Sequence, residues 1–141
     1  MLKYPVKLTL DTNDTLLVTF PDIPETVTFG ETRDEALSRA LDALECMIMA
    51  KMDDREPIPM PSASKGKDFV TLPALSTAKI LLYNSMIKAG VSKSELARQI
   101  GGHAPQIERL LDLNHASRMD QIERALSVLG LHLTVGLKKV A

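Results

Sequence analysis

Residues 91–113, VSKSELARQIGGHAPQIERLLDL, predict two short helices joined by a tight turn. Ser92 and Glu95 form a capping box at the start of the first helix, because their side chains satisfy backbone N–H groups there. The glycines at 101 and 102 end this helix, since glycine enters left-handed backbone geometry without a steric penalty. Pro105 suits the first turn of the second helix, where its missing N–H needs no intrahelical partner.

The apolar residues of this stretch agree with a helix-turn-helix motif. Ala97 is small where the second helix crosses, Gly101 lies at the bend, and Ile107 and Leu110 supply inward anchors. An αα-hairpin inside a helical bundle explains the same apolar positions equally well. The turn chemistry, together with polar residues on the exposed side of the second helix, favours DNA binding.

Polar side chains of the two helices are the candidate DNA contacts. Glutamine can bond bidentately to adenine and arginine to guanine in the major groove. Glu108 and Asp112 would repel phosphates, so we expect both on the flank of the motif. The candidate DNA-binding residues are Ser92, Lys93, His103, Gln106 and Arg109.

Length and composition are those of a globular chain. It has 141 residues, 45% hydrophobic and 25% charged, which allows one ordinary domain or two small ones. No apolar run approaches the roughly 20 residues needed to span a bilayer, and the first residues lack a signal-peptide core, so we expect a cytoplasmic protein. Cys46 is the single cysteine; it can form no internal disulfide, has no partners for a zinc site, and is expected to pack in the core.

The net charge of −1 hides a division along the chain. Residues 1–73 hold 8 Lys and Arg against 13 Asp and Glu, a net charge of −5, whereas residues 74–141 hold 9 against 5, a net charge of +4. A basic second half fits a nucleic acid, and an acidic first half suits a basic protein. Ordinary variation of surface charge is the alternative explanation.

The first half predicts a β-β-β-α-β arrangement. Alternating residues predict strands at 4–10, 16–20 and 27–29, and a fourth at 69–72. Thr32 and Glu35 form a second capping box, which opens a helix. A proline-rich, exposed segment separates this helix from the last strand. The apolar stripe of the helix is expected at Leu37, Leu41, Leu44 and Ile48, with Ala36 and Ala40 beside it.

The second half predicts four helices and a terminal strand. A helix at about 76–89 is expected to pack through Leu82, Met86 and Ala89, and a last helix is expected to be capped by Ser117 with Asp120. Residues 131–137 alternate, which predicts a strand that needs a partner from elsewhere. We expect it to pair with its copy in a second chain; docking on the N-terminal sheet is the alternative. The expected domains are 1–73 and 74–141.

Across both halves, the chain resembles the HicB antitoxins of bacterial toxin–antitoxin pairs, in the form that carries a C-terminal helix-turn-helix. The order and spacing of several short segments carry the resemblance. They include Lys3-Tyr4-Pro5-Val6, Phe20-Pro21-Asp22-Ile23-Pro24, Gly30-Glu31-Thr32, Asp42-Ala43-Leu44, Ile58-Pro59-Met60-Pro61-Ser62, Glu95-Leu96-Ala97-Arg98-Gln99-Ile100-Gly101 and Asn114-His115-Ala116.

The resemblance implies an α+β protein with a partial ribonuclease-H-like N-terminal domain that binds and masks HicA, a small basic toxin that cleaves mRNA. The C-terminal domain would repress the protein's own operon as a homodimer on operator DNA, with pairing of dimers into tetramers left open. One departure is Gly102, where such motifs often place an apolar residue. No short motif fixes the toxin contact; the acidic candidates are Asp22, Glu25, Asp42 and Glu45.

Catalysis is not expected, and neither are a metal or a cofactor. Active ribonuclease-H-like enzymes hold two divalent metals with clustered carboxylates. Here the first strand carries no acid at its centre, and Asp22, Glu35 and Asp42 are scattered over a corner and a helix. The alternative function is a stand-alone transcriptional regulator whose N-terminal domain senses a ligand. A purely structural adaptor would leave the recognition helix unexplained.

Overall fold

The structure is a computed structural model that describes residues 1–140. It divides into two compact units, Met1–Thr77 and Ala78–Ala141, called here the N-terminal and C-terminal units. The boundary falls inside helix α2, Ala74–Ala89. The mixed composition of helices and antiparallel strands confirms the α+β class. The functional division at residues 73 and 74 remains a prediction.

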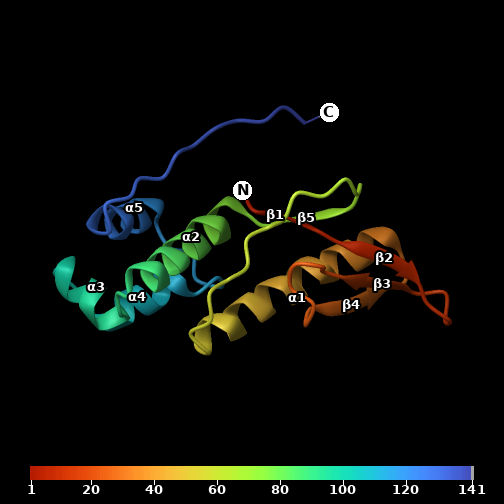
Figure 1. The fold of residues 1–141 in the computed structure, drawn as a ribbon, viewed down its shortest axis with the longest axis horizontal. Helices are drawn as coiled ribbons and strands as arrows, with labels where there is room; N and C mark the ends of the chain where they lie inside the picture. Colours follow the sequence, from red (N-terminus) through yellow and green to blue (C-terminus); the bar gives the residue numbers. More distant parts are fainter. Residues whose placement is uncertain (141) are drawn as a thin grey trace. The chain divides into compact units, whose positions relative to one another are not determined.

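The N-terminal unit contains two antiparallel sheets and one long helix (Figure 1). One sheet has the order β2-β3-β4, and the other pairs β1 with β5. Helix α1, Arg33–Asp53, lies along the three-stranded sheet. The strands are β1 Lys3–Pro5, β2 Lys7–Leu10, β3 Leu16–Thr19, β4 Val27–Gly30 and β5 Phe69–Thr71.

The prediction of one continuous first strand was wrong. The chain leaves the first sheet after Pro5 and enters the second at Lys7, while the Val6 N–H donates to the Asp68 carbonyl at 3.0 Å. Proline has no N–H to donate to a ladder, so a strand containing it is readily interrupted. The observed element order is therefore β-β-β-β-α-β.

The buried stripe of α1 is rotated from the prediction. Leu37 and Leu41 are only half-buried, and the two alanines are fully buried, because their small side chains allow the helix to approach the sheet closely. Cys46 is exposed, so its expected place in the core was wrong. The predicted cap is confirmed, since Thr32 Oγ1 accepts from the Glu35 N–H at 3.1 Å. The stripe is Ala36, Ala40, Leu44, Ile48 and Met52.

Gly30, at the end of β4, touches the first turn of α1 through its backbone. A Cβ atom added to it would lie 2.5 Å from the Ala36 nitrogen and 2.7 Å from its Cα. Helix backbone cannot yield to such a contact as a flexible side chain can. Glycine is therefore required where the sheet meets the helix.

The proline-rich segment is fixed by long-range hydrogen bonds. Tyr4, fully buried, donates its hydroxyl to the Pro59 carbonyl at 2.7 Å. The Ser62 N–H donates to an Asp22 carboxylate oxygen at 2.9 Å. The segment has no regular secondary structure from residue 56 to residue 66, yet Ile58 is buried. It is an ordered cover over the end of β1 rather than a loose linker.

Tyr4 predicts a loss of stability at high pH. Burial, with a smaller contribution from the negative charge of Asp22, raises the pKa of Tyr4 from 10.0 to about 12. The pKa of Tyr4 is higher in the folded protein than in the unfolded chain. The stabilisation by its protonated hydroxyl is therefore complete below the unfolded-state pKa and is lost as the pH rises through the folded-state pKa. Relative to Tyr4→Phe, the unfolding free energy should fall by about 1.4 kcal/mol per pH unit across this interval. Denaturant titrations of both proteins at several pH values test this, and parallel curves would contradict it.

The C-terminal unit is helical. After the rest of α2, it contains α3 Lys93–Gln99, α4 Ala104–Leu111 and α5 Met119–Val128. Leu82 and Met86 of α2 are buried as predicted, whereas Ala89 is exposed, so its packing role was wrong. The buried side chains of the other helices include Leu96, Ala97, Ile107, Leu110, Ile122, Ala125 and Leu126.

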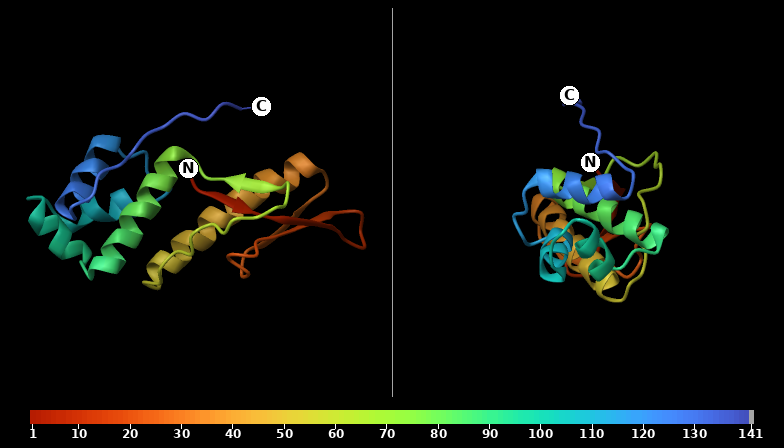
Figure 2. Two further views of the ribbon diagram at one scale, coloured as in Figure 1. Left: turned by 45° about the horizontal axis from the view of Figure 1, so that its top comes forward. Right: turned by 90° about the vertical axis from the view of Figure 1, so that its left-hand side faces the viewer.

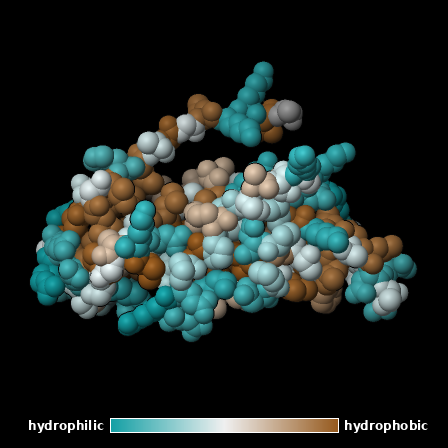
Figure 3. Space-filling model, viewed as in Figure 1, coloured by the Kyte–Doolittle hydropathy of each residue, from teal (hydrophilic) through white to brown (hydrophobic). Residues whose placement is uncertain are grey.

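Residues 131–140, which follow α5, carry no regular secondary structure. Figure 2 shows this segment leaving α5, and residues 131–140 belong to neither sheet. A strand needs a neighbouring backbone to bond, and within the described chain these residues have none, so the predicted pairing with a second copy stays a prediction. The apolar side chains of this segment are exposed: Val135, Leu137 and Val140 are each at least 90% accessible. Brown hydrophobic spheres recur along this tail in Figure 3.

Candidate nucleic-acid interface and protein-binding surface

The α3–α4 pair is built as the sequence predicted. Ser92 caps α3, with its Oγ accepting from the Glu95 N–H at 3.1 Å. Gly101 has a φ of +72°, the left-handed geometry that favours glycine, and it closes the turn. Ile107 and Leu110 of α4 are buried, which leaves the other side of this helix facing solvent.

Gln106 has a structural task that the sequence did not reveal. Its side-chain oxygen accepts from the backbone N–H of His103, the N-cap of α4, at 2.9 Å. A Cβ on Gly102 would lie 2.1 Å from this oxygen, so a side chain at position 102 would push the end of the Gln106 side chain aside. A bidentate bond to adenine uses the same oxygen, so the cap and base recognition depend on one side-chain atom.

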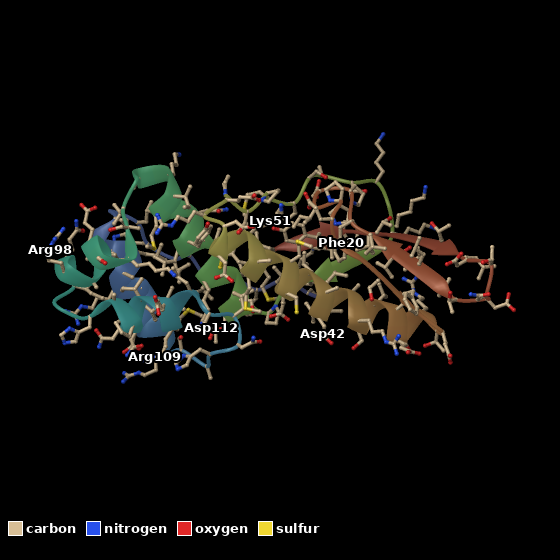
Figure 4. The ribbon with its side chains drawn as sticks, turned by 90° about the horizontal axis from the view of Figure 1, so that it is seen from below. Phe20, Asp42, Lys51, Arg98, Arg109 and Asp112 are labelled. Atoms are coloured by element: carbon tan, nitrogen blue, oxygen red, sulfur yellow. The ribbon has the colours of Figure 1, made fainter. Side chains whose placement is uncertain are left out.

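Arg109 is the candidate best presented to a ligand. Its side chain is exposed and projects from α4 (Figure 4). Among the described residues it forms no ion pair. Ser92, Lys93 and His103 are also exposed, but only Gln106 and Arg109 among the predicted residues line one cavity.

A buried lysine anchors the end of α4. Lys79 of α2 is completely inaccessible, and its Nζ donates to the carbonyl oxygens of Arg109 at 3.0 Å, Asp112 at 2.6 Å and His115 at 2.7 Å. It also lies 2.8 Å from Ser117 Oγ. Burial lowers the pKa of Lys79, and the negative charge of Asp112 opposes this shift. Carbonyls at and after the C-terminal end of α4, which already accept backbone N–H groups, thereby gain a cationic donor.

The predicted cap at Ser117 was wrong for the same reason. Its hydroxyl is held by Lys79 and hydrogen-bonds to His115 Nδ1 at 2.9 Å. The N-cap of α5 is instead Arg118, which makes no side-chain cap bond. The signal available in the sequence was a lone lysine inside an apolar run, Ala78-Lys79-Ile80-Leu81-Leu82.

The acidic candidates of the N-terminal unit do not form one cluster of free carboxylates. Asp22 accepts from Ser62, as described above. Glu25 pairs with Lys51 at 3.5 Å, and Glu45 accepts from the Ser76 hydroxyl at 3.2 Å. Asp42, on α1, is exposed (Figure 4).

An apolar feature of the same unit was missed. Val27 and Phe29 of the edge strand β4 are 53% and 55% accessible. Phe29 lies opposite Leu17 in the register and on the same face, the one turned away from α1. In the sequence of β3 and β4, apolar residues fall on both faces of the sheet. This pattern could have predicted an exposed apolar surface. Exposed apolar side chains at a sheet edge are typical of protein-binding surfaces.

Within residues 1–140, no group of three His, Cys, Asp or Glu side chains is arranged to hold a metal ion. The described helices include none long and apolar enough to cross a membrane.

Comparison with known proteins assigns this architecture to a class. Residues 3–81 match a family described as the HicB-like antitoxin of bacterial toxin–antitoxin systems. The chain is 45% identical over 132 residues to antitoxin HicB 2 of Photorhabdus laumondii, covering 94% of each chain. It is 40% identical to antitoxin HicB of Pseudomonas fluorescens, covering 83% of this chain and 82% of that one, and 38% identical to antitoxin HicB of Escherichia coli K12, covering 95% and 98%. The chain belongs to the HicB-like antitoxin family.

Proposed function

We propose that this antitoxin neutralises a HicA-type mRNA-cleaving toxin with its N-terminal unit and represses its own operon with its C-terminal unit. The family match supports toxin neutralisation by the N-terminal unit, because it covers residues 3–81. The similarity to antitoxin HicB 2 extends over 94% of both chains. The acidic N-terminal half and the basic C-terminal half support the division of tasks.

Neutralisation would be steric. A three-stranded antiparallel sheet covered by α1 supports a partial ribonuclease-H-like domain with no catalytic role of its own. The exposed edge of β4 and the exposed Asp42 of α1 are proposed to meet a basic toxin. A protein that covers the nuclease site excludes RNA without performing chemistry.

Co-purification tests the antitoxin role. This chain is expressed with the neighbouring reading frame, and only this chain is tagged. A small basic ribonuclease should come down inactive and regain activity when it is separated under denaturing conditions and refolded. If nothing co-purifies while the chain still binds its own promoter, the N-terminal unit is instead a ligand sensor.

Operator binding is proposed for the α3–α4 pair as a helix-turn-helix, with α4 in the major groove. Arg109→Ala should cost about 1–3 kcal/mol of binding free energy and relax one base position. Arg98→Ala, which removes the same charge from the exposed end of α3, is the matched control. Binding to a library of operator variants distinguishes the two. An equal loss on every sequence would show that Arg109 contacts only a phosphate.

The homodimer is proposed to form through residues 131–141, by antiparallel pairing of the exposed alternating tail with its copy. Deleting these residues should give a monomer with weakened operator affinity, because two half-sites are then no longer bound together. Sedimentation and operator titration measure both. A truncated chain that stays dimeric and keeps its affinity would overturn the assignment.

A further inference from the structure

A cavity of about 440 Å³ opens in the C-terminal unit between the α3–α4 turn, α4 and the start of α5. Its described lining contains no carboxylate residue. Concave surfaces lined by cations without acids are typical of anion sites. Besides Ser117, the polar residues that line it are Arg109, Arg118, Arg124, His115, Gln106 and Gln121.

The three arginines differ in the contacts that hold their guanidinium groups. Arg124 Nη2 donates to the Ile100 carbonyl at 2.8 Å, which fixes this guanidinium beside the turn. Arg118 pairs with Asp120 at 2.7 Å, but both side chains are more than half exposed. Exposed pairs contribute little free energy, so a multiply charged anion can compete for Arg118. One arginine is thus fixed and two can turn toward a ligand.

The start of α5 supplies a second, independent feature. Arg118 is its N-cap and makes no side-chain cap bond. The first-turn N–H groups of this ten-residue helix therefore lack a side-chain acceptor at the cap. An anion bound there would satisfy these donors and interact favourably with the helix dipole.

We propose that this cavity binds a phosphate group, and that in the complex the phosphate belongs to the operator backbone beside the groove that α4 enters. Guanidinium groups match phosphate oxygens in bidentate geometry. Arg109 lines the cavity and also belongs to the proposed recognition helix, so a phosphate held there would set the position of α4 along the duplex. This inference rests on the proposed operator binding. A free phosphate or nucleotide is the other source of the same chemistry.

Two substitutions test the cavity. Arg118→Gln removes one cation, and Gln121→Glu places a carboxylate in the lining with almost no change in shape. Arg98→Gln and Ser127→Glu make the same charge changes at exposed positions outside the lining. Circular dichroism should show that all four proteins are folded, since each substituted side chain is exposed.

The measurement is affinity against salt concentration on the operator and on a scrambled duplex. Arg118→Gln should lower the salt slope by about 1 and weaken binding to both duplexes by the same factor, because a phosphate contact carries no sequence information. Gln121→Glu should weaken binding further. If both variants match their controls in slope and affinity, the assignment is overturned.

A second arm separates the sources of phosphate. Inorganic phosphate is titrated into the DNA-free protein and followed by thermal unfolding against sodium chloride of equal ionic strength. Stabilisation of the wild type but not of Gln121→Glu, with DNA binding of the two unchanged, assigns the cavity to a free anion and overturns the operator contact. If the wild type binds no duplex, the operator proposal itself has failed, and the phosphate titration alone decides whether the cavity is an anion site.

Discussion

Replacing Lys79 with methionine is expected to destabilise the C-terminal unit by about 3 kcal/mol or more. Methionine fills a similar volume but cannot donate, so three carbonyls near the end of α4 lose their charged donor and keep only neutral donors. Hydrogen bonds to a charged group contribute about 1.5–3 kcal/mol each. Denaturant unfolding measures the loss. Lys88→Met, on an exposed lysine of the same helix, is the control.

Lys79→Met should also separate the two proposed functions. Operator binding should be lost, because α4 is no longer held at its C-terminal end. Toxin should still co-purify, since all four acceptors of the Lys79 ammonium lie in the C-terminal unit. Equal unfolding curves for the variants at Lys79 and Lys88 would show that the buried ammonium contributes nothing to stability.

Replacing Gly30 with alanine should have the opposite pattern. The added Cβ would overlap the backbone of Ala36, so β4 must move away from α1 at a cost of about 1–3 kcal/mol or more. Toxin inhibition should fall because the sheet carries the proposed contact surface, whereas operator affinity per folded dimer should be kept. Gly66→Ala is the control, because Gly66 is exposed in the same unit and an added Cβ there meets only the Ser64 hydroxyl, at 3.2 Å. A Gly30 variant as stable and as inhibitory as this control would refute the close-contact argument.

Local chemistry decided what the sequence could predict. The caps by Thr32 and Ser92 were found because donor and acceptor lie three residues apart. The left-handed turn at Gly101 was found for the same reason, since only the residue itself sets its backbone preference. The helices of the α3–α4 pair followed from these signals and from the spacing of apolar residues.

Long-range chemistry accounts for what was missed. The acceptors of Lys79 lie 30 to 38 residues away, and no pattern within one helix reveals them. Ser117 was taken for a cap because its spacing to Asp120 is suitable, although its hydroxyl binds that lysine instead. The cavity at the start of α5 was missed because its residues come from separate segments. The alternation of the tail predicts a strand only together with a partner backbone, which a single chain does not supply.

The contact between Gly102 and Gln106 limits how this gene can diverge after duplication. Under the proposed operator binding, a bacterium with two such operons avoids crosstalk only if each protein prefers its own operator. A new residue at 106 loses the α4 cap unless it reaches back as glutamine does, and a side chain at position 102 would displace the capping group. The Arg109 side chain forms no ion pair among the described residues and does not cap α4. Under the same proposal, a substitution at position 109 can therefore change operator preference without loss of the α4 cap.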